Sequence, residues 1–147
     1  MRILLAIDDS KFSEVATETV IAQARPKETE VHVLNVIDVL PQLMPEMGGY
    51  YPGIEHERDA QRKPAEALVA KTAELLRSKG LAVTTAVELG NPKSKIIDAA
   101  SKWHADLIVL GSHGRTGLER FLMGSVAEAV GRHAGCSVEI VRIPSKH

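Results

Sequence analysis

The stretch LIVLGSHG at residues 107–114 joins an apolar run to a glycine-rich segment that continues as far as Gly124-Ser125. Four consecutive apolar residues, Leu107 to Leu110, are typical of a strand that is covered on both faces of a parallel sheet. In such sheets, ligands bind beyond the carboxyl ends of the strands. We therefore predict an α/β fold in which a strand over residues 107–110 ends at Gly111.

Four other segments have the apolar or β-branched character of strands, namely residues 3–7, 31–37, 82–89 and 137–143. Between the strands, apolar residues recur at helical spacing in segments that begin after Ser10, near Ala65, at Asn91-Pro92 and near Val126. Strict alternation of strands and helices predicts a three-layer αβα fold that is Rossmann-like and has a five-stranded parallel sheet. The length of 147 residues suits a single domain over residues 1–147.

Local signals predict where several elements begin and end. The first helix stops before Pro26, because the residue that precedes a proline avoids the α region. Asn91 is suited to cap a helix whose first residue is Pro92, and Gly80 stands where a C-terminal cap glycine belongs. Residues 38–55 hold three prolines, three glycines and both tyrosines, so we predict a long irregular segment there.

Composition excludes several classes of function. The net charge is −1, from 18 basic and 19 acidic residues, and only 3% of the residues are aromatic. Nucleic-acid binding is therefore not expected, because it needs clustered cations or stacking rings.

One cysteine excludes a disulfide framework. The apolar residues 3–7 meet two aspartates at once, which argues against a signal peptide. No apolar run approaches the roughly 20 residues of a membrane helix, so we expect a cytoplasmic protein without a membrane partner.

The glycine-rich segment is the most specific candidate site. Glycines allow positive φ and close approach of the backbone to a ligand, and successive N–H groups form an anion nest. The helix that opens at Gly124-Ser125 adds free N–H groups and a favourable dipole, and Arg115 adds a positive charge. The alternative is a plain βα loop in which Ser125 caps the helix. Neither a Walker loop nor G-x-G-x-x-G occurs in the sequence.

Asp8 and Asp9 follow the first strand. A carboxylate there accepts hydrogen bonds from ribose hydroxyls or holds Mg²⁺ together with phosphate oxygens. The alternative is helix capping, which suits Ser10 or Asp9, and we take Asp8 as the better ligand candidate. His113 is the one histidine inside the loop motif, and we expect it to shape the loop rather than to catalyse a reaction. We interpret Cys136 as a small apolar residue and not as a nucleophile.

Three motifs make the chain resemble the universal stress protein family over its whole length. They are AIDDS-x-x-S-x-x-A from Ala6 to Ala16, VLNVID from Val33 to Asp38, and ADLIVLGSHG from Ala105 to Gly114. The ATP-binding subgroup of that family has the pattern G-x2-G-x9-G-[ST]. Gly111, Gly114, Gly124 and Ser125 fill this pattern completely.

The resemblance implies that the chain has a fold similar to that of adenine nucleotide alpha hydrolases. It also implies a binding site for ATP, which is the expected cofactor. By this resemblance, adenine is expected to contact Ala6, Ile7 and Val36, largely through the backbone, and Asp8 is expected to face the ribose or a metal ion. The expected ribose and phosphate contacts are Leu110, Gly111, Ser112, His113, Gly114, Arg115, Thr116 and Gly117. The expected contacts to the outer phosphates are Gly124, Ser125, Val126 and Ala127.

The resemblance also implies the role of the protein. It predicts an ATP-binding regulatory or stress-response module that forms a homodimer through the last strand, Ser137 to Ile143. The alternative is a slow ATP hydrolase or an autophosphorylating enzyme, with Ser112, Thr116 or Ser125 as the acceptor. Asp9 stands where family members often carry glycine, and its carboxylate would repel phosphates unless it points to solvent or binds a cation.

Overall fold

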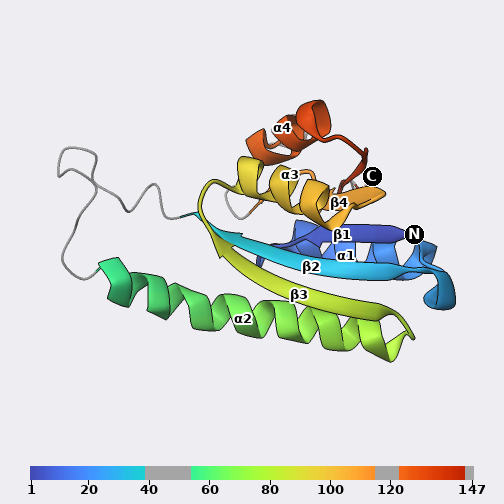
Figure 1. Cartoon of the computed structure of the whole chain (residues 1–147), viewed down its shortest axis with the longest axis horizontal. Coiled ribbons are helices and arrows are strands. Elements are labelled where there is room, and N and C mark those ends of the chain that lie inside the picture. Colours follow the sequence, from blue (N-terminus) through green and yellow to red (C-terminus); the bar gives the residue numbers. More distant parts are fainter. Residues whose placement is uncertain (39–53, 115–122, 145–147) are drawn as a thin grey trace.

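A computed structural model describes residues 1–38, 54–114 and 123–144 of the chain (Figure 1). Strands and helices alternate along it, as the hydrophobic pattern predicts. The elements are β1 (Arg2–Ala6), α1 (Lys11–Gln23), the short 3-10 helix η1 (Pro26–Glu28), β2 (Glu30–Ile37), α2 (Ile54–Ser78), β3 (Ala82–Leu89), α3 (Pro92–Trp103), β4 (Leu107–Gly111), α4 (Ser125–His133) and β5 (Ser137–Val141).

The described strands form one parallel sheet of five strands in the order β3-β2-β1-β4-β5, which confirms the predicted fold class. Leu5 of β1 lies between Val33 of β2 and Val109 of β4. The strands β2 and β3 follow β1 on one side of it, and β4 and β5 lie on its other side. The strand order therefore reverses between β1 and β4, and ligands of such sheets bind at this switch point.

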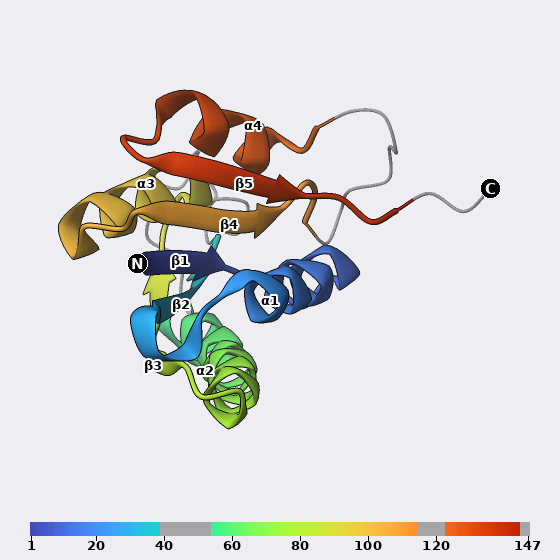
Figure 2. The same ribbon diagram turned by 90° about the vertical axis from the view of Figure 1, so that its right-hand side faces the viewer.

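Helices cover both faces of the sheet, with α1 and α2 on one side and α3 and α4 on the other (Figures 1 and 2). Alternate residues of β1 serve the two cores, because neighbouring side chains of a strand point to opposite faces. Ile3 and Leu5 pack with Val20 of α1 and Leu76 of α2. Leu4 and Ala6 belong to the second core, whose helix residues are Ile96, Ala100, Ala127 and Val130.

Most of the predicted boundaries agree with the structure. Ser10 caps α1, and its Oγ accepts a hydrogen bond from the Ser13 N–H at 3.3 Å. The Asn91 Oδ1 accepts from the N–H of Lys93 at 2.9 Å, as expected of a cap before Pro92. Gly80 follows α2 with a φ of +87°, which glycine adopts without strain.

Two boundaries predicted from the sequence are wrong. The helix α2 begins at Ile54, inside the segment 38–55 that we expected to be irregular, and it continues through Pro64. The sequence before Pro64 is polar, so it carries no apolar periodicity that would mark a helix. The rest of that segment, residues 39–53, lies outside the described residues. The last strand ends at Val141, two residues before the predicted end at Ile143.

No helix within the described ranges is long and apolar enough to cross a membrane.

Candidate functional site

A cavity of about 430 Å³ lies at the switch point of the sheet. Its wall is formed by the carboxyl ends of β1, β2 and β4 together with the first turns of α3 and α4. This volume is within the range of small-molecule sites, roughly 300–1,000 Å³. The floor is aliphatic and includes Ile7, Leu34 and Val36, with Ile96 entering from α3.

The backbone of β1 is held in place where it enters this cavity. The N–H of Ile7 donates to the carbonyl of Leu34 at 2.9 Å, which extends the pairing with β2 by one residue. The buried Asn35 donates from Nδ2 to the Ile7 carbonyl at 2.6 Å. Both polar groups of the Ile7 backbone are therefore satisfied inside the protein. This fixes the Ile7 backbone where it lines the cavity, while its side chain packs in the core with Val20 of α1 and Leu76 of α2.

Asp8 follows directly and takes part in a compact network with Ser10 and Ser13. Its Oδ1 accepts hydrogen bonds from the N–H of Ser10 and from Oγ of Ser13, both at 2.9 Å. The other oxygen, Oδ2, lies beside Gly114. Asp9 points differently, because it is exposed and does not line the cavity. Asp9 is thus placed toward solvent, as required if its carboxylate is not to repel the expected phosphates.

The glycines of the loop are required by close packing and not by their φ angles. Among the described glycines, only Gly80 and Gly90 have positive φ, so the expectation of positive φ is wrong for Gly111, Gly114 and Gly124. A Cβ on Gly111 would lie 2.5 Å from Cβ of Phe12. A Cβ on Gly124 would lie 2.7 Å from the Ser112 carbonyl oxygen. Gly111 therefore allows β4 to pack closely against α1, and Gly124 allows the start of α4 to pack closely against the backbone at Ser112.

The helix α4 opens onto the cavity without a side-chain cap. Gly124 is its N-cap residue, and no side-chain hydrogen bond to the helix end occurs within the described residues. The alternative in which Ser125 caps the helix is therefore wrong, because Ser125 is the first helical residue. The first N–H groups of an α-helix have no partner inside the helix and attract anions. Ser125, Val126 and Ala127 line the cavity with this end of α4.

His113 shapes the loop, as expected from the sequence. Its Nδ1 lies 3.2 Å from Oγ of Ser112, and its ring packs against Phe12 with the ring centroids 5.2 Å apart. Ser112 is 3% exposed and does not line the cavity. The Ser112 backbone instead joins Val141 of β5 to Gly124, through an N–H donated to Val141 and a carbonyl that accepts from Gly124.

The structure brings most of the predicted residues together around one cavity. The predicted residues that line it are Ala6, Ile7, Asp8, Val36, Leu110, Gly111, His113, Gly114, Gly124, Ser125, Val126 and Ala127. Arg115, Thr116 and Gly117 lie outside the described residues. The lining residues that the sequence did not suggest are Ser13, Leu34, Pro92, Ile96 and Met123. Ser13 and Leu34 lie within the motifs quoted above, but the nucleotide pattern did not single them out.

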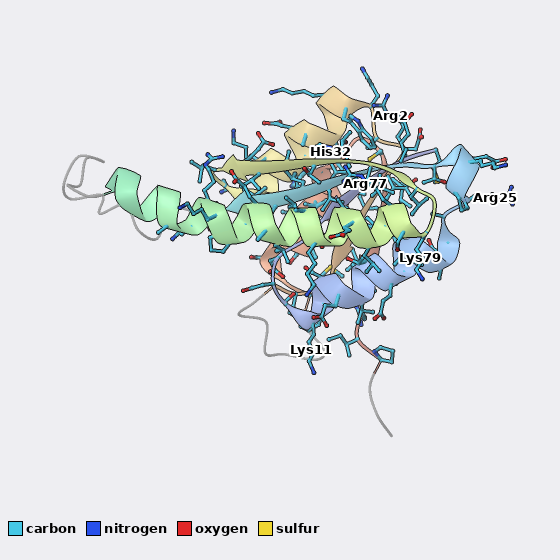
Figure 3. The ribbon with its side chains drawn as sticks, turned by 90° about the horizontal axis from the view of Figure 1, so that it is seen from below. Arg2, Lys11, Arg25, His32, Arg77 and Lys79 are labelled. Carbon is cyan, nitrogen blue, oxygen red and sulfur yellow. The ribbon has the colours of Figure 1, made fainter. Side chains whose placement is uncertain are left out.

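The charges near the cavity are few. Asp8 is the one lining residue with a formal charge in the described part of the chain, with histidine counted as neutral. Several basic side chains lie elsewhere: Arg2, Arg25 and Lys79 lie toward the end of the molecule where the strands begin (Figure 3). No group of three or more His, Cys, Asp or Glu side chains within the described ranges is arranged to hold a metal ion. A cation at Asp8 would need oxygen ligands from a bound molecule.

Comparison with known proteins agrees with this arrangement. A model of the universal stress protein family matches residues 1–142. The chain belongs to the universal stress protein family. Universal stress protein MJ0531 of Methanocaldococcus jannaschii is 34% identical over 146 residues, which make up 99% of this chain and 84% of the relative. The solved structure of hypothetical protein MJ0577 is 27% identical with a TM-score of 0.87, over 99% of this chain and 97% of the other.

Two more distant structures of universal stress proteins contain adenine nucleotides. One is a complex with cAMP, which is 20% identical with a TM-score of 0.68 over 97% of this chain and 96% of the other. The second is a family member from Arabidopsis thaliana with AMP bound, which is 16% identical with a TM-score of 0.68 over 99% of this chain and 93% of the other. At these identities the two structures establish a shared fold.

Proposed function

We propose that this universal stress protein binds an adenine nucleotide in the cavity at the switch point, with ATP as the expected ligand, and acts as a regulatory module. The observation that carries the proposal is the start of α4, which has no side-chain cap among the described residues and meets an aliphatic cavity whose described lining holds one carboxylate. An apolar floor suits a purine base, and unpaired helix N–H groups suit phosphates. The cAMP and AMP complexes of the two distant relatives support an adenine nucleotide as the ligand class.

Within this proposal, the base lies on the floor near Ile7 and Val36, and no Phe, Tyr or Trp lines the cavity in the described part of the chain. Asp8 faces the ribose hydroxyls or a Mg²⁺ ion shared with phosphate oxygens. The outer phosphates lie at the N-terminus of α4, near Ser125. Among the described lining residues, Asp8 and His113 are the side chains that could act as a base, and both are engaged in contacts within the site, so we expect any hydrolysis of the bound nucleotide to be slow.

Isothermal titration calorimetry with ATP, ADP, AMP and cAMP tests the proposal, with and without Mg²⁺. The decisive variant is Gly124→Ala, because its Cβ would lie 2.7 Å from a backbone oxygen and would displace the start of α4. Gly135→Ala is the matched control, since a Cβ there meets nothing within 4 Å. We expect loss of affinity in the first variant and wild-type affinity in the second. Absence of binding by the wild type to all four nucleotides would contradict the proposal.

We also propose a homodimer that pairs through β5. This strand is at the edge of the sheet, next to β4, and the exposed Ile143 follows it. An open edge strand offers unpaired backbone groups to a second chain. In a two-fold dimer the β5 strands of the two subunits pair with each other, so each covers the edge of the other. Sedimentation equilibrium measures the mass directly, and a monomer at tens of micromolar protein would refute the dimer.

A further inference from the structure

Ser13 lines the cavity, and its hydroxyl group both accepts a hydrogen bond from Asp8 and donates one to it. The Asp8 N–H donates to Oγ of Ser13 at 2.8 Å, and the same Oγ donates its proton to Oδ1 of Asp8 at 2.9 Å. A serine hydroxyl has one proton, so this group has no second one to give to a ligand. Ser13 is also only 7% exposed. The hydroxyl proton of Ser13 therefore acts on a ligand only through Asp8.

The start of α1 fixes the same carboxylate from a second direction. The Ser10 N–H donates to Oδ1 of Asp8 at 2.9 Å, while Oγ of Ser10 accepts from the Ser13 N–H at 3.3 Å. Oδ1 is thus held by two donors from one short segment, and rotation of the carboxylate would break both hydrogen bonds. Oδ2 of the same carboxylate lies beside Gly114, and both residues line the cavity.

We propose that Ser13 is a positioning residue, which fixes the Asp8 carboxylate so that Oδ2 faces the nucleotide. The inference rests on the proposed function, and it adds that Ser13 acts on affinity only through Asp8. The group recognised by Oδ2 is a hydrogen-bond donor or a divalent cation of the bound nucleotide. Loss of the Ser13 hydroxyl lets the carboxylate turn, so its alignment is lost although its charge stays.

The experiment is a double-mutant cycle of ATP affinity, measured by calorimetry with Mg²⁺ present. We expect Asp8→Ala to weaken binding about tenfold, since one hydrogen bond to a charged group is lost. Ser13→Ala is expected to weaken binding by a smaller factor. The double variant Asp8→Ala/Ser13→Ala is expected to match Asp8→Ala alone. Multiplication of the two single effects would overturn the inference, because Ser13 would then act independently of Asp8.

Thr17→Val is the matched control, because Thr17 is another buried hydroxyl of α1 and donates to the Ser13 carbonyl rather than to Asp8. We expect it to leave the affinity for ATP unchanged. Repeating the titrations with 2′,3′-dideoxy-ATP and without Mg²⁺ separates the two ligands of Oδ2. If a ribose hydroxyl is recognised, the Ser13→Ala effect disappears with 2′,3′-dideoxy-ATP, and if the cation is recognised, it disappears without Mg²⁺. Persistence of the effect under both conditions would overturn recognition through Oδ2.

A measurement without nucleotide keeps this inference separate from the proposed function. Amide hydrogen exchange of the ligand-free protein, followed by NMR, reports on the N–H groups of Asp8 and Ser10. Ser13→Ala removes the acceptor of the first group and loosens the acceptor of the second, so both amides are expected to exchange faster than in Thr17→Val. Unchanged exchange would overturn the inference. Faster exchange in a protein that binds no nucleotide would uphold the positioning of Asp8 and contradict the proposed function.

Discussion

The Asp8 carboxylate lies where a side chain on Gly114 would begin, because a Cβ built at Gly114 would be 2.8 Å from Oδ2 of Asp8. The segment that follows the first strand supplies this carboxylate, and the glycine-rich loop packs against it with a residue that has no side chain. Gly114 is separated from Asp8 by more than a hundred residues of sequence, and the strand order brings the two together. This relationship explains why the second glycine of the nucleotide pattern has no side chain.

Gly114→Ala is expected to displace either the carboxylate or the loop and to weaken ATP binding by about tenfold or more. The fold should tolerate the change, because Gly114 is exposed and the atom that it meets belongs to a side chain. Calorimetry and thermal unfolding on the same samples separate the two effects. Wild-type affinity in Gly114→Ala would show that the contact with Asp8 has no influence on binding.

Two other glycines are expected to respond in opposite directions. Gly111→Ala brings a Cβ within 2.5 Å of Cβ and 3.0 Å of the carbonyl carbon of Phe12, so α1 must move, at a cost of about 1–3 kcal/mol. Gly131→Ala lies inside α4, where its Cβ meets Ile140 at 3.4 Å, and it should gain up to ~1 kcal/mol from helix propensity. Urea unfolding measures both changes. Equal free energies of unfolding for the two variants would contradict this prediction.

Asn35→Ala is expected to lower the free energy of unfolding by about 1–3 kcal/mol, because the buried carbonyl of Ile7 loses its side-chain donor. The variant should also bind ATP more weakly, since the backbone at Ile7 forms part of the cavity floor. Asn35→Asp is the sharper test, as it has the same shape and sets a carboxylate oxygen against that carbonyl. Unfolding midpoints equal to that of the wild type would exclude this role for Asn35.

His32 predicts how stability depends on pH. Burial lowers the pKa of His32 below its usual 6.5, with a smaller lowering effect from Arg2 and an opposing effect from Glu88. Arg2 also stacks on Trp103 at 4.4 Å, and the ring of Trp103 lies 5.3 Å from that of His32. The folded protein therefore favours the neutral imidazole more strongly than the unfolded chain does.

The sign of the dependence follows from proton linkage. The unfolded chain takes up the His32 proton near pH 6.5, while the folded protein resists it until lower pH. The stability from neutral His32 is therefore present above pH 6.5 and is lost as the pH falls from there through the folded pKa. Urea unfolding at pH 7.5 and pH 5.5 should show a smaller difference in His32→Gln than in the wild type. An equal difference in both proteins would contradict the lowered pKa.

The order of elements and the edge of the sheet that holds the cavity were predictable, because both follow from the local signals that identify the strands and helices. Consecutive apolar residues in 107–110 identify a buried strand, and Asn91-Pro92 identifies the start of α3. The rule that ligands bind beyond the carboxyl ends of the strands then places Asp8 and the glycine-rich loop at one edge. The polar first turns of α2 were not predictable, because they carry no hydrophobic periodicity and contain Pro64.

By itself, the sequence determined the alternation of strands and helices, and thereby the layered parallel sheet, since these follow from side-chain periodicity within short windows. Only the tertiary structure decided what each glycine of the loop faces. Phe12, Asp8 and the Ser112 carbonyl come to lie against Gly111, Gly114 and Gly124 because β1 and β4 are neighbours and α1 and α4 start beside them. Such contacts depend on the positions of segments that are distant in the chain. No local pattern specifies them.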